Sequence, residues 1–288
     1  MRKVKKCFIV LFVLLSTLSL FPKSGIKNTF PLSDMIFVKG GSFIQQDANA
    51  VSGKVNKSFI HNVSSFYIGK YEVSYEIWKS VYDWAVIKGY TFDNVGSPGM
   101  VEEVKIKDTS KLPITNISYY DALVWCNAYS EKFQYEPVYY SADGEVVRDI
   151  RNLKREEKKN IYANWEANGY RLPTEGEWYF AARSRGAEGN IKIKQKMTDR
   201  IYDVDDISCN KLGLYGVDHN VWEWIWDWYG TLPSGKKRDY RGPNSGDGKI
   251  TLGGQAYICD HIISGHRLGV ITSIKNSFIG LRVARSGQ

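Results

Sequence analysis

Apolar positions along this 288-residue chain follow short, regular patterns that predict strands and helices over most of its length. Residues 35–44 carry apolar side chains on both sides of a glycine pair and predict two short strands, and residues 66–73 predict another strand. Helices are predicted after Ser74, Ser118 and Thr174, because each of these N-cap residues precedes aromatic and aliphatic residues at helical spacing.

The pattern stops within the last fifty residues. Gly253-Gly254 opens this region and Gly280 to Arg285 closes it as a glycine followed by a short strand, whereas Tyr257 to Ile279 shows neither strand alternation nor helical periodicity. A segment without a structural pattern, held between segments that have one, is typical of a surface whose content is free to vary. It indicates binding rather than folding or chemistry.

The first 25 residues have the composition of a secretory signal peptide. Four cations lie within residues 1–6, and the apolar run from Cys7 to Leu20 is too short for a membrane span of roughly 20 residues. Removing residues 1–25 lowers the formal charge from +8 to +3, an ordinary balance that gives no reason to expect a nucleic-acid partner. We expect an exported protein, at the cell surface or in the periplasm.

The remaining sequence contains no internal repeat or low-complexity linker, so we expect a single domain over residues 33–288 and a monomer. After export, the chain would keep Cys126, Cys209 and Cys259. Three is an odd number, so at least one thiol is free and no disulfide framework is indicated. The mixed charge run of residues 148–159 is interpreted as a solvated loop or helix face.

Several blocks resemble the formylglycine-generating enzyme, or sulfatase-modifying factor, family. The most specific block is Asn168 to Trp178, and the second runs from Gly213 to Tyr215 and on to Asn220 to Trp224. The other similar blocks are residues 35–43, 66–73, 113–131 and 280–285. The resemblance implies an α+β, C-type lectin-like fold that is rich in loops, with short strands and two or three main helices.

The oxidases of this family resemble copper enzymes that hold Cu(I) with two cysteines near the C-terminus. Thiolates suit Cu(I), and a single thiolate would hold it poorly. Here Cys259 is the one cysteine of that region, and Ser264 stands five positions later. A mixed site with His261 or His266 is an alternative that the residues leave open. We do not expect copper, and a formylglycine-generating or related copper-dependent oxidase is the second interpretation.

The family's calcium motif is only partly present. Glu223 matches a carboxylate ligand and Val221 a backbone-carbonyl position, whereas Gly216 stands where a side-chain oxygen is expected and His219 replaces a glycine. Calcium takes six to eight oxygen ligands, so a site at Glu223 and Val221 is left open while no cofactor is required. The tryptophans of residues 222–228 are interpreted as an aromatic core.

A narrower resemblance is to the variable proteins of diversity-generating retroelements, which place hypervariable residues near the C-terminus of this domain. In those systems template adenines are randomised, so AAC codons become any codon ending in C. Such codons cannot encode Trp, Met, Gln, Lys or Glu. Between Tyr257 and Ile279 only Lys275 belongs to that excluded set. Residues 255–279 are therefore the candidate variable region.

The sequence is interpreted as an exported, non-enzymatic display protein whose C-terminal surface binds a protein or glycan ligand. Isoleucines and aromatic residues would anchor the ligand, and polar residues, including Arg267, would supply directional hydrogen bonds. The candidate ligand-binding residues are Tyr257, Ile258, Asp260, His261, Ile263, His266, Leu268, Val270, Ile271, Ser273, Ile274, Asn276 and Phe278. Gly253, Gly254, Gly280 and Arg282 are expected to belong to the frame.

Overall fold

Strand β9 (Trp222–Trp228) is central to the largest sheet, because it pairs with β11 (Lys249–Gly253) on one side and with β13 (Ile279–Gly280) on the other. Strand β12 (Leu268–Val270) lies beyond β11 and completes the order β12-β11-β9-β13. The pairs β11–β12 and β11–β9 are antiparallel, and β13–β9 is parallel. The C-terminal part of the chain therefore forms both edges of this sheet.

Two three-stranded sheets and two short ribbons complete the strands of the described structure. One sheet has the order β1-β4-β14 (Met35–Val38, Phe66–Gly69 and Ala284–Ser286). The other has the order β10-β3-β2 (Lys236–Arg238, Ser58–Val63 and Gly41–Gln46). The ribbons pair β5 (Ser97–Pro98) with β6 (Ile114–Thr115), and β7 (Tyr139–Tyr140) with β8 (Tyr162–Ala163).

The computed structural model describes residues 34–46, 57–99, 108–184, 201–217, 219–254 and 267–287, which all fall within the unit from Leu32 to Gln288. The predicted signal peptide lies outside these residues. Over the described ranges, no helix combines the length and the apolar character that crossing a membrane requires.

The helices begin where the N-cap pattern predicts them. They are α1 (Tyr75–Ile87), α2 (Tyr119–Lys132), the short α3 (Arg155–Lys159) and α4 (Glu175–Ala182). Ser74 caps α1, and Ser118 and Thr174 form capping boxes with Asp121 and Glu177 at the starts of α2 and α4. Short strands, long connections and three main helices agree with the expected α+β fold.

Residues 35–44 form two strands as predicted; β1 pairs with β4 and β2 pairs with β3. Two other predicted strands differ from the observed ones. The strand predicted behind Gly280 begins only at Ala284, as β14. The strand predicted over residues 66–73 ends at Gly69. Beyond it the chain turns away from the sheet, and the Glu72 carboxylate accepts hydrogen bonds from the Asn220 side chain and the Val221 N–H, at 2.5 and 3.1 Å.

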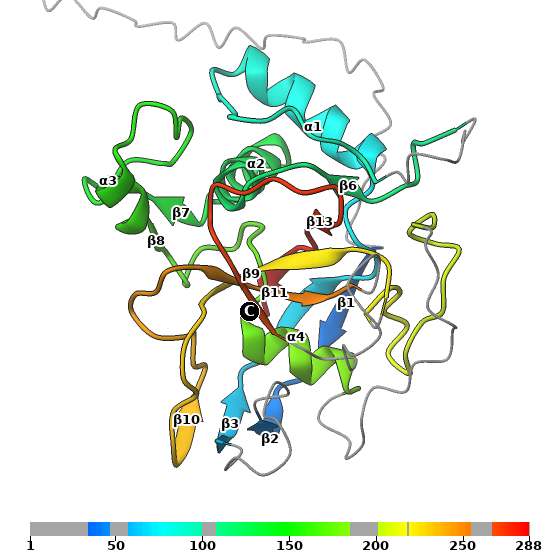
Figure 1. Cartoon of the computed structure of the whole chain (residues 1–288), viewed down its shortest axis with the longest axis vertical. Helices are drawn as coiled ribbons and strands as arrows, with labels where there is room; N and C mark the ends of the chain where they lie inside the picture. The colour runs from blue at the N-terminus through cyan, green and yellow to red at the C-terminus, as the bar shows by residue number, and fades with distance from the viewer. Residues whose placement is uncertain are drawn as a thin grey trace, which may run out of the picture. The chain divides into compact units, whose positions relative to one another are not determined.

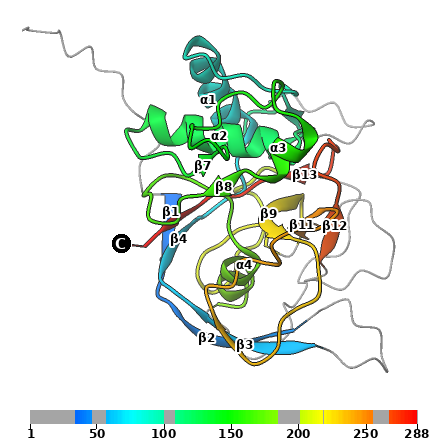
Figure 2. The same ribbon diagram turned by 90° about the vertical axis from the view of Figure 1, so that its left-hand side faces the viewer.

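The core has two layers, one on each side of the β9 sheet. Trp222 and Trp224 belong to the layer that contains α1 and α2, where Trp78 and Trp125 stack with ring centroids 5.4 Å apart. Ile225 belongs to the layer around α4. Figure 2 shows α1 and α2 on one side of this sheet and α4 on the other, above β2 and β3. Trp222 and Trp224 are buried as the aromatic-core interpretation requires, and Trp226 and Trp228 are half-buried.

His61 on β3 is buried within this structure as a neutral ring. Its Nδ1 lies 2.7 Å from Gln45 Oε1, and its Nε2 accepts a hydrogen bond from the Tyr240 N–H at 2.9 Å. Because Nε2 accepts, the ring proton belongs on Nδ1, where it is donated to Gln45. Burial lowers the pKa of His61 from 6.5 to about 4.

This shift predicts a loss of stability in acid. Between pH 6.5 and 4 the unfolded chain binds a proton at His61 that the folded chain does not. The contribution of His61 to the free energy of unfolding is therefore fully present above pH 6.5 and is lost as the pH falls through 4. The loss should reach about 3 kcal/mol at most. Chemical denaturation across this range should show a steeper pH dependence for the native sequence than for His61→Gln. Equal slopes would contradict the assignment.

Candidate functional site

The structure describes one half of the predicted ligand-binding segment. Leu268, Val270, Ile271, Ser273, Ile274, Asn276 and Phe278 lie within residues 267–287. Six other predicted contacts lie outside the described residues: Tyr257, Ile258, Asp260, His261, Ile263 and His266. The described part leaves the sheet at β12, passes α2 as an irregular turn over residues 271–278, and re-enters the sheet at β13 (Figure 1).

Main-chain hydrogen bonds hold this turn against the rest of the molecule. The Tyr119 N–H at the start of α2 donates to the Thr272 carbonyl at 3.1 Å, and the Asn116 N–H donates to the Asn276 carbonyl at 3.0 Å. The Trp222 N–H on β9 donates to the Phe278 carbonyl at 2.7 Å. Carbonyl groups are common to all residues, so these three attachments do not depend on the side chains of the turn.

The side chains of the segment divide into outward and supporting ones. Ile271 and Ile274 are 56% and 41% exposed, although they are large apolar residues, and Ser273 is exposed as well. The supporting residues are Leu268, Val270 and Phe278, which are half-buried and pack against the core, and Asn276, whose side chain accepts a hydrogen bond from the Phe278 N–H. The middle of the turn is therefore the part that offers its side chains to solvent.

The prediction that Arg267 contacts a ligand is wrong. Its side chain is buried, with Nε 2.7 Å from Glu175 Oε1 at the start of α4. Its Nη1 donates to the Gly230 carbonyl at 2.8 Å, and its guanidinium carbon lies 5.0 Å from the centre of the Tyr229 ring. Arg267 thus fixes the described start of the segment to the scaffold.

A second buried ion pair lies just beyond the end of the segment. Arg282 Nη2 is 2.7 Å from Glu223 Oε1, and both side chains are fully buried. The other Arg282 donors reach the carbonyls of Gly69, Lys70 and Tyr215. The expectation that Arg282 is held by its surroundings is therefore confirmed.

This arrangement does not fit a calcium site at Glu223. Both of its carboxylate oxygens accept hydrogen bonds from Arg282, and Oε2 also accepts one from Trp178 Nε1 at 2.7 Å. A cation at this carboxylate would be placed beside a buried guanidinium, which carries the same charge. The Val221 N–H donates to Glu72, and burial together with the Glu223 charge raises the pKa of Glu72 well above its usual range. No metal-binding group of three or more His, Cys, Asp or Glu occurs among the described residues.

Two glycines at the borders of the segment are required by close contacts. Gly254 has φ of 50°, and a Cβ atom there would lie 2.5 Å from the main-chain nitrogen of Trp222. A Cβ atom at Gly280 would overlap the Ile114 carbonyl oxygen. Substitution at either position would displace main chain rather than a flexible side chain, as expected for residues of the frame.

A cavity of about 460 Å³ borders the exposed turn. Its walls combine segment residues with residues of the scaffold: Ile271, Thr272 and Ser273 face Tyr120 of α2, Trp228 of β9, and Arg155, Lys158 and Lys159 of α3. Helix α3 has no buried residue, so the interpretation of residues 148–159 as solvated is correct for this helix. That the cations of α3 lie beside residue 271 could not be predicted from the sequence. Asp93 and Asp247 also line the cavity, so a ligand here would meet exposed apolar groups, a half-buried indole and charges of both signs.

Comparison with known proteins identifies relatives over most of the chain. The family model for the sulfatase-modifying factor enzyme 1-like domain matches residues 21–287. The structure is similar to that of Treponema denticola variable protein 1, with a TM-score of 0.67 and 27% identity, covering 88% of this chain and 95% of that one. It is also similar to CarF, with a TM-score of 0.68 and 25% identity, covering 88% and 98% of the two chains.

Two relatives with different names are similar in sequence. The chaperone protein LppX of Paenibacillus barcinonensis is 28% identical over 232 residues, which cover 70% of this chain and 74% of that protein. The formylglycine-generating enzyme of Thermomonospora curvata is 32% identical over 127 residues. That alignment covers 34% of this chain and 41% of the enzyme, so the similarity to the enzyme is partial.

Truncating the buried anchor Arg267 should lower the free energy of unfolding much more than truncating the exposed isoleucines of the turn. Arg267→Ala would leave the buried Glu175 carboxylate without its guanidinium partner and should lower the free energy of unfolding by about 3–5 kcal/mol. Ile271→Ala and Ile274→Ala, matched exposed changes in the same segment, should cost less than about 1 kcal/mol. Urea denaturation of the three variants tests this. Equal losses would mean that the isoleucines are core residues and not a display surface.

Proposed function

The chain belongs to the sulfatase-modifying factor enzyme 1-like domain family, and from this premise we propose that it is an exported, non-enzymatic ligand-binding protein. Residues 255–279 form its contact surface, and their content is diversified. Because a fold of this kind can carry different functions, the proposal depends on the site and not on the family alone.

The observation that carries the proposal is the way in which the turn over residues 271–278 is attached. Its ends are fixed by strand pairing, and its middle is bonded to Asn116 and Tyr119 through its own carbonyl groups. Exposed side chains between these attachments can be exchanged without loss of a scaffold bond. A surface whose ligand changes when its residues change needs a backbone position that does not depend on its exposed side chains.

Similarity to a protein called variable protein 1, over 88% of this chain, supports the same proposal. The composition of the segment adds a second line of support. Lys275 is the one residue between Tyr257 and Ile279 that a codon ending in C could not encode.

The apolar part of the interaction is assigned to Ile271 and Ile274. Large exposed side chains contribute most to binding when a partner covers them and excludes water. The fixed wall of the neighbouring cavity, with Trp228 and Arg155, supplies contacts that every variant would share. The ligand is a protein or a glycan, and its identity would change from one variant to the next.

The alternative function, a copper-dependent oxidase that generates formylglycine, is favoured less by the residues of this chain. The pair of thiolates expected for Cu(I) is reduced to Cys259, with Ser264 five positions later.

The coding DNA provides the test. Most codons for residues 255–279 should end in C, and a near-identical repeat rich in AAC codons should lie close by, next to a reverse-transcriptase gene. Codons for Gly254, Gly280 and Arg282, and within the segment the codon for Arg267, should be spared, because these residues make the contacts that hold the frame. Sequencing the locus from several isolates would reveal the substitutions. Third bases spread over all four nucleotides, with no repeat nearby, would refute the diversification.

A further inference from the structure

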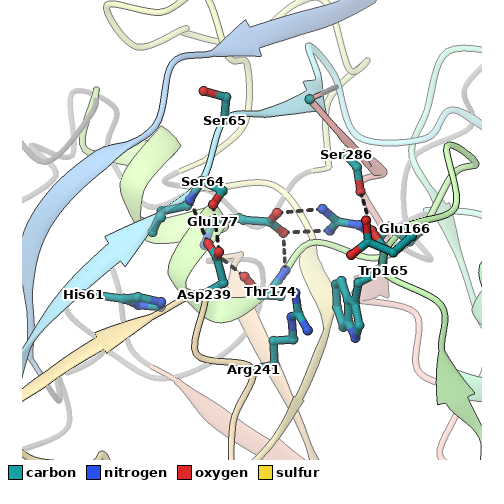
Figure 3. Close-up of a pocket in the computed structure, with 13 residues that line it drawn as sticks. His61, Ser64, Ser65, Trp165, Glu166, Thr174, Glu177, Asp239, Arg241 and Ser286 are labelled. Atoms are coloured by element: carbon teal, nitrogen blue, oxygen red, sulfur yellow. Dashed lines mark hydrogen bonds and ion pairs between the residues drawn. The ribbon is translucent and has the colours of Figure 1, made fainter.

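A second cleft lies on the scaffold, and none of the described residues of the 255–279 segment lines it. It is a cavity of about 210 Å³ between β3, the residues that precede and begin α4, the chain after β10, and the C-terminal residues Ser286 and Gly287. Figure 3 shows its polar side chains converging from these separate parts of the chain. Convergence of polar groups around a hollow is the usual form of a small-ligand site.

The charges that line this cleft are largely compensated within it. Arg171 and Glu177 form a two-pronged ion pair with N–O distances of 2.7 and 2.6 Å. Asp239 accepts hydrogen bonds from the main-chain N–H and the hydroxyl of Ser64, both at 2.7 Å. Asp239 is held in the left-handed region with φ of 45°, a conformation that costs energy in residues other than glycine.

Arg241 lines the same cleft but takes no part in the ion pair and hydrogen bonds described above. Its guanidinium lies 3.9 Å from the centre of the Trp165 ring, while Arg171 lies 5.0 Å from the same ring. Over the ranges that the structure describes, no carboxylate lies within ion-pair distance of Arg241. Stacking on an indole fixes the plane of the guanidinium and leaves its N–H groups free to donate along its edges.

A second hollow of about 550 Å³ adjoins the cleft, since Trp165, Glu166 and Arg241 line both. The second hollow adds Tyr140 of β7 and Tyr162 of β8, whose rings stack with centroids 5.9 Å apart. Tyr162 is 46% exposed. The two adjoining hollows are here called the Trp165 groove, with carboxylates and hydroxyls at one end and aromatic rings at the other.

We propose that the Trp165 groove binds a neutral oligosaccharide. Sugar rings present apolar C–H faces that cover aromatic side chains, and hydroxyls that both donate and accept hydrogen bonds. In the groove, Asp239 accepts while Arg241 donates, and Tyr162 supplies the apolar face. An anionic ligand would meet the Asp239 carboxylate and a cationic ligand would meet Arg241, so a neutral polyhydroxylated ligand matches both. None of the described segment residues lines the site, so the proposal goes beyond the proposed display function.

The test is calorimetric titration of the full chain with neutral hexasaccharides: cellohexaose, maltohexaose, mannohexaose and chitohexaose. We expect at least one to bind, and Tyr162→Ala and Arg241→Ala each to weaken its affinity tenfold or more. Both residues are exposed, so both variants should fold, and their unfolding temperatures provide the check. Phe37→Ala, which truncates an aromatic residue that is 51% exposed outside the groove, should leave the affinity unchanged.

A double variant, Ile271→Ala with Ile274→Ala, separates this proposal from the display function, because it changes the variable surface and not the groove. Its saccharide affinity should equal that of the native sequence. The proposal would be overturned if no hexasaccharide bound, if binding survived unchanged in Tyr162→Ala and Arg241→Ala, or if the double variant lost it. The coding-DNA test of diversification is independent of all these results.

Discussion

Two buried arginine–glutamate pairs, Arg267–Glu175 and Arg282–Glu223, set the positions on which the C-terminal surface depends. Each pair removes two charges from water, a cost that good geometry and further hydrogen bonds must offset. Arg282 meets this condition through carbonyl groups from two other parts of the chain, and Arg267 through the Gly230 carbonyl. Removing one partner would leave an isolated buried charge, so neither end of the described segment can shift without a large loss of stability.

Fixed ends explain why the middle of the segment can be irregular. Strands β12 and β13 occupy opposite edges of one sheet, and the chain between them crosses from edge to edge past α2. The scaffold binds this crossing by its carbonyl groups, and Ile271 and Ile274 remain in solvent. Main-chain carbonyl groups thus hold the turn in place, and its outward side chains determine what it can bind. This separation is the physical basis of the display proposal.

Local features could be predicted from the sequence, and contacts between distant residues could not. The starts of three helices follow from Ser74, Ser118 and Thr174, since a cap and the residues it serves are only a few positions apart. The prediction that Arg267 faces a ligand failed because its partner, Glu175, is 92 positions away in the sequence. No local pattern connects the two residues. For the same reason the cavity between α3 and the turn, and the Trp165 groove, became visible only in the folded chain.

Hydrogen exchange at two backbone amides is the most direct test of the central claim that the turn is held independently of its side chains. Asn116 and Tyr119 donate to the Asn276 and Thr272 carbonyls. In a variant that carries Ile271→Ser, Ser273→Ala, Ile274→Thr and Lys275→Ser together, their protection measured by NMR should match that of the native sequence. Loss of protection at both amides, with the core amides of α2 still protected, would contradict the account and show that the outward side chains hold the turn in place.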